Sequence, residues 1–546
     1  MILNVSSSVA ETARTDPFRK ALVCPIARDS NGRLAYTHFT YRQLDQESDC
    51  IAAGLASSGI GHGTRTILAL PPGLDFYSLA VALFKIGAVP VIMEPGMGIP
   101  AMVRRIKGAQ PEAFIGLPWT RMLKLLRPDC FRNLKAFIVT GRRLLWGGLT
   151  MRDIRKVPWV PVEVAQTTAD DTAAVIFTPG NTGPAKGVVL THGCLISRAN
   201  QLKEQFAIGS DEIDLATHSG GAFFGLVLGL TSIIPDMDPE HPFLAEPDNI
   251  IEPIIDQGVT NLSASPALLD QIGQFGRNNR ISLPSLRRIL SMGAPLPASH
   301  MERFSKVLPP DVEIHVLYGS EEAMPIMSVG SNEVQSETSG LSAKGYGSCI
   351  GRPVSNTEVR LITITDAPIE RFTDDMVPPQ GEIGELIVRG DAVAAGYLDN
   401  PDLDTLLTIS DNGGVWHRTG DLGWMDKNNR FWFCGRKNHC VLTEQGPLYP
   451  IPCEAIFNTH PDVCRCALVG TGPLENRTPV LCVELEEVDT RDKQRIKTEL
   501  RELAEHNIIT RDIKNILFHK QLPVDTRHQA KIIREELAAW AEKQLK

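Results

Sequence analysis

The chain has 546 residues, of which 43% are hydrophobic and 22% are charged, and its formal net charge is −9. This length exceeds what one hydrophobic core usually serves, so we expect two or more domains. The acidic balance argues against a nucleic-acid partner, because such partners are held largely by contacts of cations with phosphates. The N-terminal sequence lacks a basic stretch followed by an apolar core, which predicts no signal peptide and a cytoplasmic protein.

Strand and helix signals alternate along the first part of the chain. Apolar runs at 66–70, 89–93 and 173–177 predict strands, and the amphipathic segment 78–85 predicts a helix between the first two. This alternation is typical of parallel sheets flanked by helices. The sequence therefore predicts an α/β fold for the larger, N-terminal part.

Residues 177–187 read Phe-Thr-Pro-Gly-Asn-Thr-Gly-Pro-Ala-Lys-Gly, between two apolar runs. Glycines let backbone N–H groups turn toward an anion, Thr178 and Thr182 add hydroxyl donors, and Lys186 adds a positive charge. The spacing differs from the Walker motif, because Gly187 follows the lysine where that motif has Ser or Thr. Taken alone, the segment is either a phosphate-binding loop or an ordinary glycine-rich hairpin.

The longest uncharged apolar stretch, residues 219–235, carries four glycines. It is too short and too interrupted for a membrane span, so we expect a buried helix and no transmembrane segment. Further on, 359–363 and 386–388 are bounded by glycines and prolines and predict a smaller antiparallel sheet or barrel region. The acidic, proline-rich segment 366–381 predicts a surface loop.

The composition changes near 433–438. Beyond this point, strand signals at 465–469 and 480–483 and amphipathic helices at 489–505 and 533–545 predict a small α+β domain. Six of the eleven cysteines lie between Cys434 and Cys482, but no CxxC pair is present. Buried thiols are therefore favoured over a zinc site or a disulfide framework.

Several separated segments together resemble the adenylate-forming superfamily of acyl-CoA synthetases, non-ribosomal adenylation domains and luciferases. The resemblance covers essentially the whole chain and follows the order of the family's motifs. The matching segments are 177–187, Tyr-Gly-Ser-Glu-Glu at 318–322, Gly-Arg-Pro at 351–353, 381–390, Arg-Thr-Gly-Asp at 418–421, Gly-Arg-Lys at 435–437 and Lys531. The segments 235–239, 416–418, 448–449, 453–463 and 523–528 resemble one branch, the olefin β-lactone synthetases.

The resemblance implies ATP and Mg²⁺ as cofactors and assigns roles to particular residues. Glu322 would bind Mg²⁺, and Lys531 would reach the α-phosphate and the acyl oxygen as a catalytic cation. Asp421 would accept the ribose hydroxyls, with Arg436 near the nucleotide. The other implied nucleotide-binding residues are Thr178, Gly180, Asn181, Thr182, Gly183, Lys186, Gly293, Ala294, Pro295, Tyr318, Gly319, Ser320 and Glu321.

The resemblance also implies a domain division and a substrate. Residues 1–434 would form the AMP-binding domain, 435–438 a hinge that includes Asn438, and 439–546 a mobile lid. The substrate would be a 2-alkyl-3-hydroxy fatty acid that is closed to a β-lactone, with partners among other enzymes of a hydrocarbon pathway. His218, Phe223 and Phe224 would contact the acyl group, although core packing is an alternative for the two phenylalanines.

Three residues depart from the superfamily pattern. Pro179 replaces a serine and lacks a backbone N–H, Asn181 stands where Ser or Thr is usual, and Glu321 replaces a threonine beside the α-phosphate. A carboxylate about 5 Å from a phosphate charge costs roughly 3 kcal/mol unless a cation compensates. Bulkier residues are also usual in the branch at Gly220 and Gly221. Two alternatives thus stay open, a fatty acid–CoA ligase that uses CoA and a weakened relative that binds without turnover.

Overall fold

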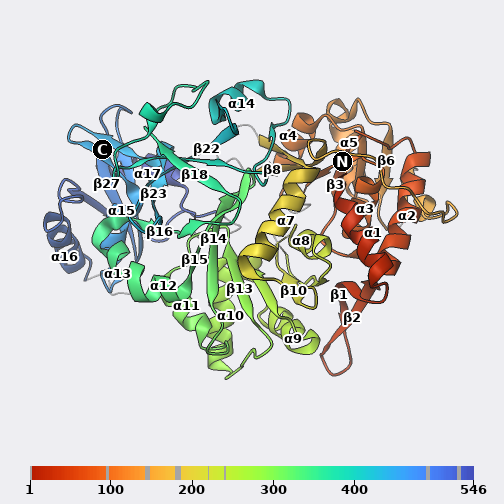
Figure 1. Ribbon diagram of the computed structural model, residues 1–546. Coiled ribbons are helices and arrows are strands. Elements are labelled where there is room, and N and C mark those ends of the chain that lie inside the picture. The colour runs from red at the N-terminus through yellow and green to blue at the C-terminus, as the bar shows by residue number, and fades with distance from the viewer. Residues whose placement is uncertain are drawn as a thin grey trace.

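The computed structural model describes residues 3–93, 97–141, 148–178, 186–218, 220–238, 241–486, 492–525 and 531–546. Two large sheets with helices between and around them form most of the molecule, followed by a smaller antiparallel sheet and a C-terminal α+β unit (Figure 1). This arrangement confirms the predicted α/β architecture. Among the described residues, no helix combines the length and the apolar character needed to cross a membrane.

The first large sheet has eight strands in the order β20-β9-β8-β4-β3-β5-β6-β7. Its strands are β3 (Arg65–Ala69), β4 (Val89–Ile92), β5 (Ala113–Gly116), β6 (Ala136–Val139), β7 (Leu149–Thr150), β8 (Thr172–Thr178), β9 (Lys186–Thr191) and β20 (Gly396–Tyr397). The strands β3 to β8 are mutually parallel, as the alternation predicts, whereas β9 pairs antiparallel with both β8 and β20. The described ends of the segment 177–187 thus belong to two antiparallel strands, β8 and β9.

The second large sheet has nine strands in the order β17-β15-β14-β13-β12-β10-β11-β1-β2. They are β1 (Lys20–Arg28), β2 (Leu34–Thr40), β10 (Ile213–Ala216), β11 (Thr231–Ile233), β12 (Asn261–Ala264), β13 (Arg288–Met292), β14 (Ile314–Ser320), β15 (Ala323–Gly330) and β17 (Arg352–Pro353). The central strands are parallel and the edge pairs are antiparallel. The carboxyl ends of β10, β12, β13 and β14 therefore meet at one edge, where ligands of open α/β sheets bind.

Helices fill the space between the two sheets and cover their outer faces. They are α1 (Val5–Thr15), α2 (Tyr41–Ser57), α3 (Leu74–Lys85), α4 (Ile99–Ala109), α5 (Thr120–Leu126), η1 (Pro128–Phe131), α6 (Met151–Ile154), α7 (His192–Phe206), α8 (Gly221–Val227), η2 (Pro242–Leu244), α9 (Asp248–Gln257), α10 (Pro266–Asn278) and α11 (Ala298–Ser305). The stretch 219–235 is not one buried helix: α8 ends at Val227, and β11 begins at Thr231 after a turn in which Gly229 has φ +75°. That prediction is wrong because a left-handed residue ends the helix.

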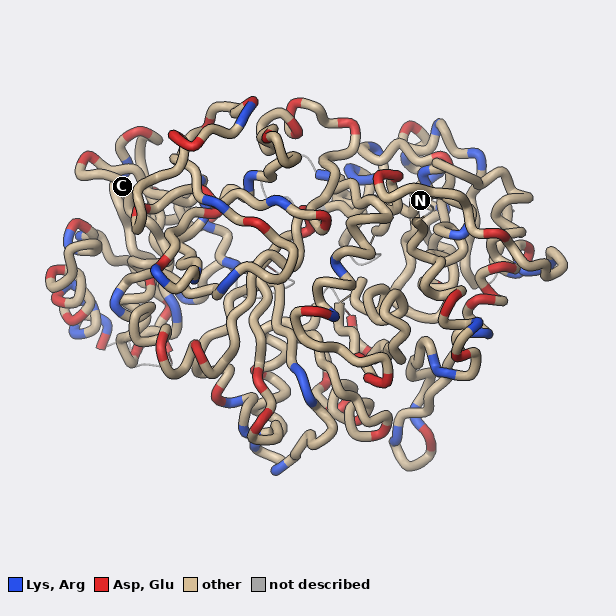
Figure 2. Tube along the Cα trace, in the orientation of Figure 1, with Lys and Arg blue, Asp and Glu red and all other residues tan. Residues whose placement is uncertain are grey.

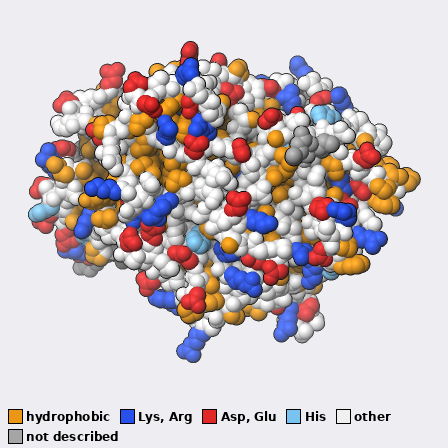
Figure 3. Space-filling view, in the orientation of Figure 1, with side chains coloured by type: hydrophobic (Ala, Val, Ile, Leu, Met, Phe, Trp, Pro, Cys, Tyr) orange, Lys and Arg blue, Asp and Glu red, His pale blue; other side chains and the backbone are white. Residues whose placement is uncertain are grey.

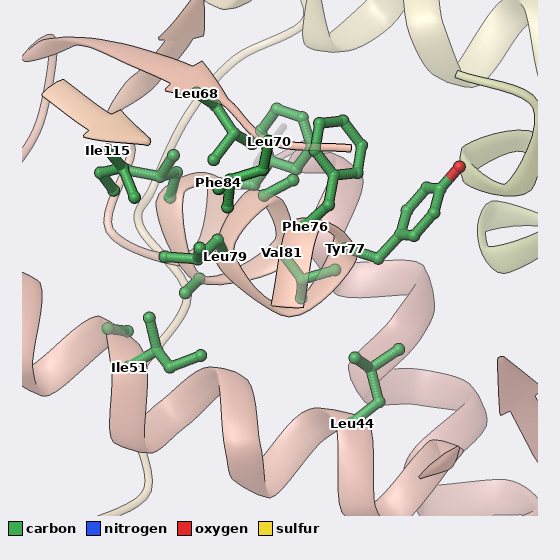
Figure 4. Close-up of a cluster of buried hydrophobic side chains, with 14 of the residues drawn as sticks. Leu44, Ile51, Leu68, Leu70, Phe76, Tyr77, Leu79, Val81, Phe84 and Ile115 are labelled. Atoms are coloured by element: carbon green, nitrogen blue, oxygen red, sulfur yellow. The ribbon is translucent and has the colours of Figure 1, made fainter. Parts of the chain in front are cut away.

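The largest core cluster lies where α2 and α3 pack beside strands of the first sheet. Figure 4 shows Leu44 and Ile51 of α2 pointing toward α3, with Leu68 and Ile115 from β3 and β5 on its other side. Helix α3 is buried along ten of its twelve residues, so its apolar surface is nearly continuous. Burying such side chains is worth about 1.5–3 kcal/mol each, which makes this cluster the rigid base of the N-terminal part.

A six-stranded antiparallel sheet follows, in the order β16-β23-β22-β19-β18 with β21 beside β22. It consists of β16 (Ser348–Cys349), β18 (Glu358–Ile362), β19 (Gly384–Arg389), β21 (Thr408–Asp411), β22 (Gly414–Met425) and β23 (Phe431–Arg436). Short helical segments connect it to its surroundings: α12 (Ser331–Glu333), η3 (Val334–Thr338), α13 (Ser339–Leu341), η4 (Ser342–Tyr346), η5 (Asp374–Met376) and α14 (Pro401–Leu407). The predicted antiparallel region is confirmed.

The remaining residues form the C-terminal unit, which starts after β23. It contains η6 (Lys437–His439), β24 (Val441–Thr443), β25 (Gly446–Leu448), α15 (Pro450–Phe457), β26 (Val463–Thr471), β27 (Thr478–Leu485), α16 (Lys493–Glu505), β28 (Asn515–Phe518) and α17 (Arg534–Leu545). Its three-stranded sheet, β26-β27-β28, has its own core with α15 and α16. The predicted strands and helices of this part are confirmed.

Candidate functional site

The arms of the candidate phosphate loop are set by the β8–β9 pairing. Thr178 ends β8 and lies opposite Lys186, the first residue of β9. The predicted ligands Gly180, Asn181, Thr182 and Gly183, with Pro179, lie outside the described residues. The Lys186 ammonium is 5.8 Å from the centre of the Tyr397 ring, whose hydroxyl donates to Glu322.

Glu321 and Glu322 form the two-residue turn between β14 and β15, with Ser320 paired to Ala323. Tyr318 and Gly319 are the last residues of β14 before Ser320. A Cβ on Gly319 would lie 2.5 Å from the Ala323 carbonyl oxygen, so the tight hairpin explains why this position is glycine. The turn projects two carboxylates from the edge where the parallel strands end.

The Glu322 carboxyl is half-buried and held in its ionised form. The Tyr397 hydroxyl donates to its Oε1 at 2.8 Å. Burial raises the pKa of Glu322, but the nearby His417 and the hydrogen bonds from Ser320 and Tyr397 together bring the pKa below its ordinary value. An ionised carboxylate at the end of a sheet is a suitable ligand for a hard cation such as Mg²⁺.

Asp421 lies on β22, opposite Arg436 on β23. The Tyr318 hydroxyl donates to Oδ2 of Asp421 at 2.5 Å, and Arg436 Nε lies 3.5 Å from Oδ1. Within the described part of the chain, Oδ1 is buried yet accepts no hydrogen bond. Burial raises the pKa of Asp421, while Arg436, the Tyr318 bond and the charge of Lys531 lower it. A buried acceptor without a donor fits the hydroxyl of a ligand.

The strand that carries Asp421 is fixed by a buried ion pair. Arg418 Nη2 and Glu385 Oε2 are 2.6 Å apart, and both side chains are only 1% exposed. Arg418 also donates to the carbonyls of Ala367 and Thr365. Arg418 therefore holds β22 against β19 and the segment 365–367.

Lys531 is the catalytic lysine implied by the resemblance, and the structure brings it to this site from the C-terminal unit. Its charge acts on the Asp421 carboxyl. Its backbone N–H donates to Asp525 Oδ1 at 2.9 Å, and its carbonyl accepts from the Asp525 N–H at 2.9 Å. Three residues later, Arg534 pairs with the buried Glu454. The lysine is thus anchored on both sides.

The remaining predicted residues lie around the same edge or farther away. Gly293, Ala294 and Pro295 follow the carboxyl end of β13, next to β14, so the structure brings them close to Tyr318. Asn438 is exposed in η6, two residues after β23 ends.

The acyl residues lie around β10 and α8. His218 follows the carboxyl end of β10. Phe223 packs edge-on against Phe76, Tyr77 and Phe84, with ring centres 6.3, 5.2 and 5.6 Å away, while Phe224 is half-buried.

Three residues of the site carry contacts that motif reasoning missed: Arg198, Tyr397 and His417. Arg198 is 3% exposed and donates to the Ala392 carbonyl at 2.9 Å and to the Glu321 carbonyl at 2.8 Å. It places a positive charge beside the turn that carries the unusual Glu321. His417 belongs to the branch-specific segment 416–418, so a signal for it existed, whereas Tyr397 and Arg198 lie in no quoted motif.

Comparison with known proteins gives one family and several relatives. The family of AMP-binding enzymes matches residues 9–398. An olefin beta-lactone synthetase of Stenotrophomonas maltophilia is 39% identical over 99% of this chain and 98% of its own length. The corresponding protein of Xanthomonas campestris pv. campestris is 38% identical over 100% and 98%.

Solved structures share the fold at low identity. The anthranilate CoA ligase AuaEII, in complex with anthranoyl-AMP, has a TM-score of 0.80 at 18% identity and covers 100% of this chain and 98% of that one. ATP-bound MatB from Rhodopseudomonas palustris has a TM-score of 0.79 at 19% identity, and both chains are covered completely. The architecture described above is therefore that of proteins crystallised with an adenylate or with ATP.

Proposed function

Because the chain belongs to the family of AMP-binding enzymes, we propose that it activates a 2-alkyl-3-hydroxy fatty acid with ATP and closes it to a β-lactone. Two relatives at 39% and 38% identity, matched over nearly their whole length, are olefin beta-lactone synthetases. The products are the β-lactone, AMP and pyrophosphate. The observation that carries the proposal is the buried, unsatisfied Asp421 Oδ1 within reach of the Lys531 charge.

In this proposal the nucleotide lies across the edge formed by β13, β14 and β22. Asp421 accepts a ribose hydroxyl at Oδ1, while Tyr318 keeps its other oxygen in place. The backbone of 293–295 and 318–320 borders the adenine, and Arg436 lies beside the nucleotide. Lys186 and the loop 178–183 hold the β- and γ-phosphates. These assignments rest on the family motifs and on the geometry of the described residues among them.

Glu322 is the residue that would hold Mg²⁺, because its lowered pKa keeps a carboxylate ionised beside the Tyr397 hydroxyl. The ion would neutralise phosphate charge as pyrophosphate departs. Glu321 adds a negative charge beside the phosphates. Arg198 donates to the main-chain carbonyl of Glu321 at 2.8 Å and so holds the turn that carries both carboxylates.

Two chemical steps follow. In the first, a carboxylate oxygen of the acid attacks the α-phosphorus, the bond to the bridging oxygen breaks, and pyrophosphate leaves. Lys531 stabilises the negative charge that develops on the α-phosphate oxygens. In the second, the 3-hydroxyl oxygen attacks the acyl carbonyl, its proton is lost to a base, and AMP leaves as the four-membered ring closes. The internal nucleophile acts at high effective concentration.

The C-terminal unit acts as the lid of this site. Residues 439–546 would pivot at 435–438, with Asn438 in the hinge, since β23 ends at Arg436 and the following strands build a separate sheet. His218, Phe223 and Phe224 would border the acyl chain. Phe223 is held in place by its packing against Phe76, Tyr77 and Phe84. Gly220 is exposed at the start of α8, and a Cβ there would meet no described atom within 4 Å.

The test is mass spectrometry of products formed from ATP, Mg²⁺ and a racemic 2-alkyl-3-hydroxy acid. We expect β-lactone and AMP without CoA. The same acid lacking its 3-hydroxyl should stop at the acyl-adenylate, because no internal nucleophile remains. Rapid thioester formation from that acid with CoA would contradict the lactone proposal and favour a CoA ligase. Absence of nucleotide binding would favour a relative that binds an acyl ligand or a partner without turnover.

A further inference from the structure

The segment 97–135 differs in charge from the rest of the protein. It contains eight Lys and Arg residues against two Asp and Glu residues, a net charge of +6 in a chain whose total is −9. Over most of the chain both signs are interspersed, along the trace in Figure 2 and over the face shown in Figure 3. Such a local excess of one sign forms a field that attracts an anionic partner.

The helix α5 within this segment exposes its apolar side chains. Only Thr120 and Leu123 of its seven residues are buried. The large apolar residues at its start and along its outer side are exposed: Trp119 36%, Met122 49%, Leu125 63% and Leu126 65%. Single exposed apolar residues are normal, but three within one short helix and a fourth at its N-cap mark an interaction surface.

Cations without acidic partners surround this helix. Two of the eight are neutralised locally, Arg127 by Asp129 at 3.1 Å and Lys135 by Glu112 at 2.5 Å. Four others are exposed and make no ion pair within the described part of the chain: Arg104, Lys107, Lys124 and Arg132. Helices α4 and α5 both pack on η1, so these cations and the apolar side chains belong to one region, at the upper margin of Figure 1.

We propose that α5 and the adjoining part of α4 form a docking surface for an anionic lipid bilayer. A bilayer offers an apolar phase and a negatively charged surface at once, which matches exposed Trp, Met and Leu side chains bordered by unpaired cations. Trp119 suits the headgroup level, and long Lys and Arg side chains reach phosphates from beside the apolar side chains. This surface lies beyond the nucleotide site and requires no particular substrate.

The test is co-sedimentation of the full-length protein with vesicles. One set is phosphatidylcholine alone and the other contains phosphatidylglycerol as well. We expect binding to the anionic vesicles only, falling as salt screens the cations. The variant K107Q/K124Q should bind about fivefold more weakly for each cation removed. The variant L125Q/L126Q should also bind more weakly, because it removes apolar contact area.

Matched controls are Ile508→Gln, an exposed apolar residue of the C-terminal unit, and Lys493→Gln at the start of α16; both should bind like the unchanged protein. Nucleotide binding by each variant checks that its fold is intact. The proposal fails if the unchanged protein ignores anionic vesicles, or if all variants bind them equally. It also fails if L125Q/L126Q instead breaks up a dimer of this chain in sedimentation, since a second copy then covers the surface.

Discussion

Replacement of Asp421 by alanine tests whether this carboxylate accepts a hydrogen bond from the ribose. Its Oδ2 accepts a hydrogen bond from the Tyr318 hydroxyl, whereas the buried Oδ1 accepts none from the described residues and has Arg436 Nε 3.5 Å away. A ligand hydroxyl therefore gains its bond to a carboxylate without displacing an existing one. The Asp421→Ala change removes that acceptor and leaves Arg436, which is 56% exposed, free to be solvated by water.

The expected magnitude follows from counting one bond. A hydrogen bond to a charged group contributes about 1.5–3 kcal/mol, so ATP should bind about 10- to 150-fold more weakly to Asp421→Ala. Asp421→Asn keeps an oxygen acceptor but loses the charge, so its loss should be smaller. Asp366→Ala is the matched control, because it removes a carboxylate that is 95% exposed near the same sheet and should leave ATP affinity unchanged.

The assay is titration calorimetry with ATP and with 2′,3′-dideoxy-ATP, which lacks both ribose hydroxyls. The unchanged protein should prefer ATP, and Asp421→Ala should lose that preference, because the double cycle isolates the contact between carboxylate and hydroxyl. Equal losses of affinity for both nucleotides would refute the reasoning. In that case Asp421 supports the fold of β22 and does not touch the ribose.

Three further predictions concern other parts of the site. Lys531→Ala should slow adenylate formation about 100-fold or more while ATP binding persists, as measured by pyrophosphate release. Arg418→Met should lower the free energy of unfolding by about 3 kcal/mol in urea, the low end for a broken buried pair, because Lys437 lies 3.5 Å from the abandoned Glu385 carboxylate. Tyr397→Phe should raise the pKa of Glu322, because it removes a hydrogen bond that offsets the effect of burial. On acidification, Glu322 should then be protonated at a higher pH, and Mg²⁺ affinity should begin to fall at that higher pH.

Each of these has a control and a result that would contradict it. Lys520→Ala alters another exposed lysine of the C-terminal unit and should leave pyrophosphate release unchanged; equal effects of both changes would remove the lysine's catalytic role. Arg371→Met alters an exposed arginine and should not change the unfolding midpoint. An unchanged pH dependence of Mg²⁺ binding in Tyr397→Phe would show that Glu322 is not the metal ligand.

Local periodicity predicted much of the fold. The strands β3, β4 and β8 were predictable because each is a short, mainly apolar run in which most described residues are buried. The helix and strand within 219–235 could not be predicted, because a continuous apolar run shows neither the helical nor the strand periodicity.

For the site, motif order indicated Glu322, Asp421 and Lys531 in advance, although their roles stay predictions. Tyr397 could not be found, because its hydroxyl meets Glu322 across 75 positions of the chain. Tertiary contacts bring it there: the β20–β9 pairing and the bond from the Ala394 N–H to the Glu322 carbonyl. Arg198 gave no signal for a similar reason, since its partners are main-chain carbonyls, which every residue type carries.

Arg198 has a consequence for how mutational data on this protein should be interpreted. Its guanidinium joins three separate stretches of chain: the helix α7 that carries it, the turn at Glu321, and residue 392. Replacing it would loosen the turn that presents Glu322 without removing any group that touches substrate. A screen scored by product alone would therefore rank Arg198 among the catalytic residues, and only separate measurement of nucleotide affinity and folded yield would reveal it as a structural tie.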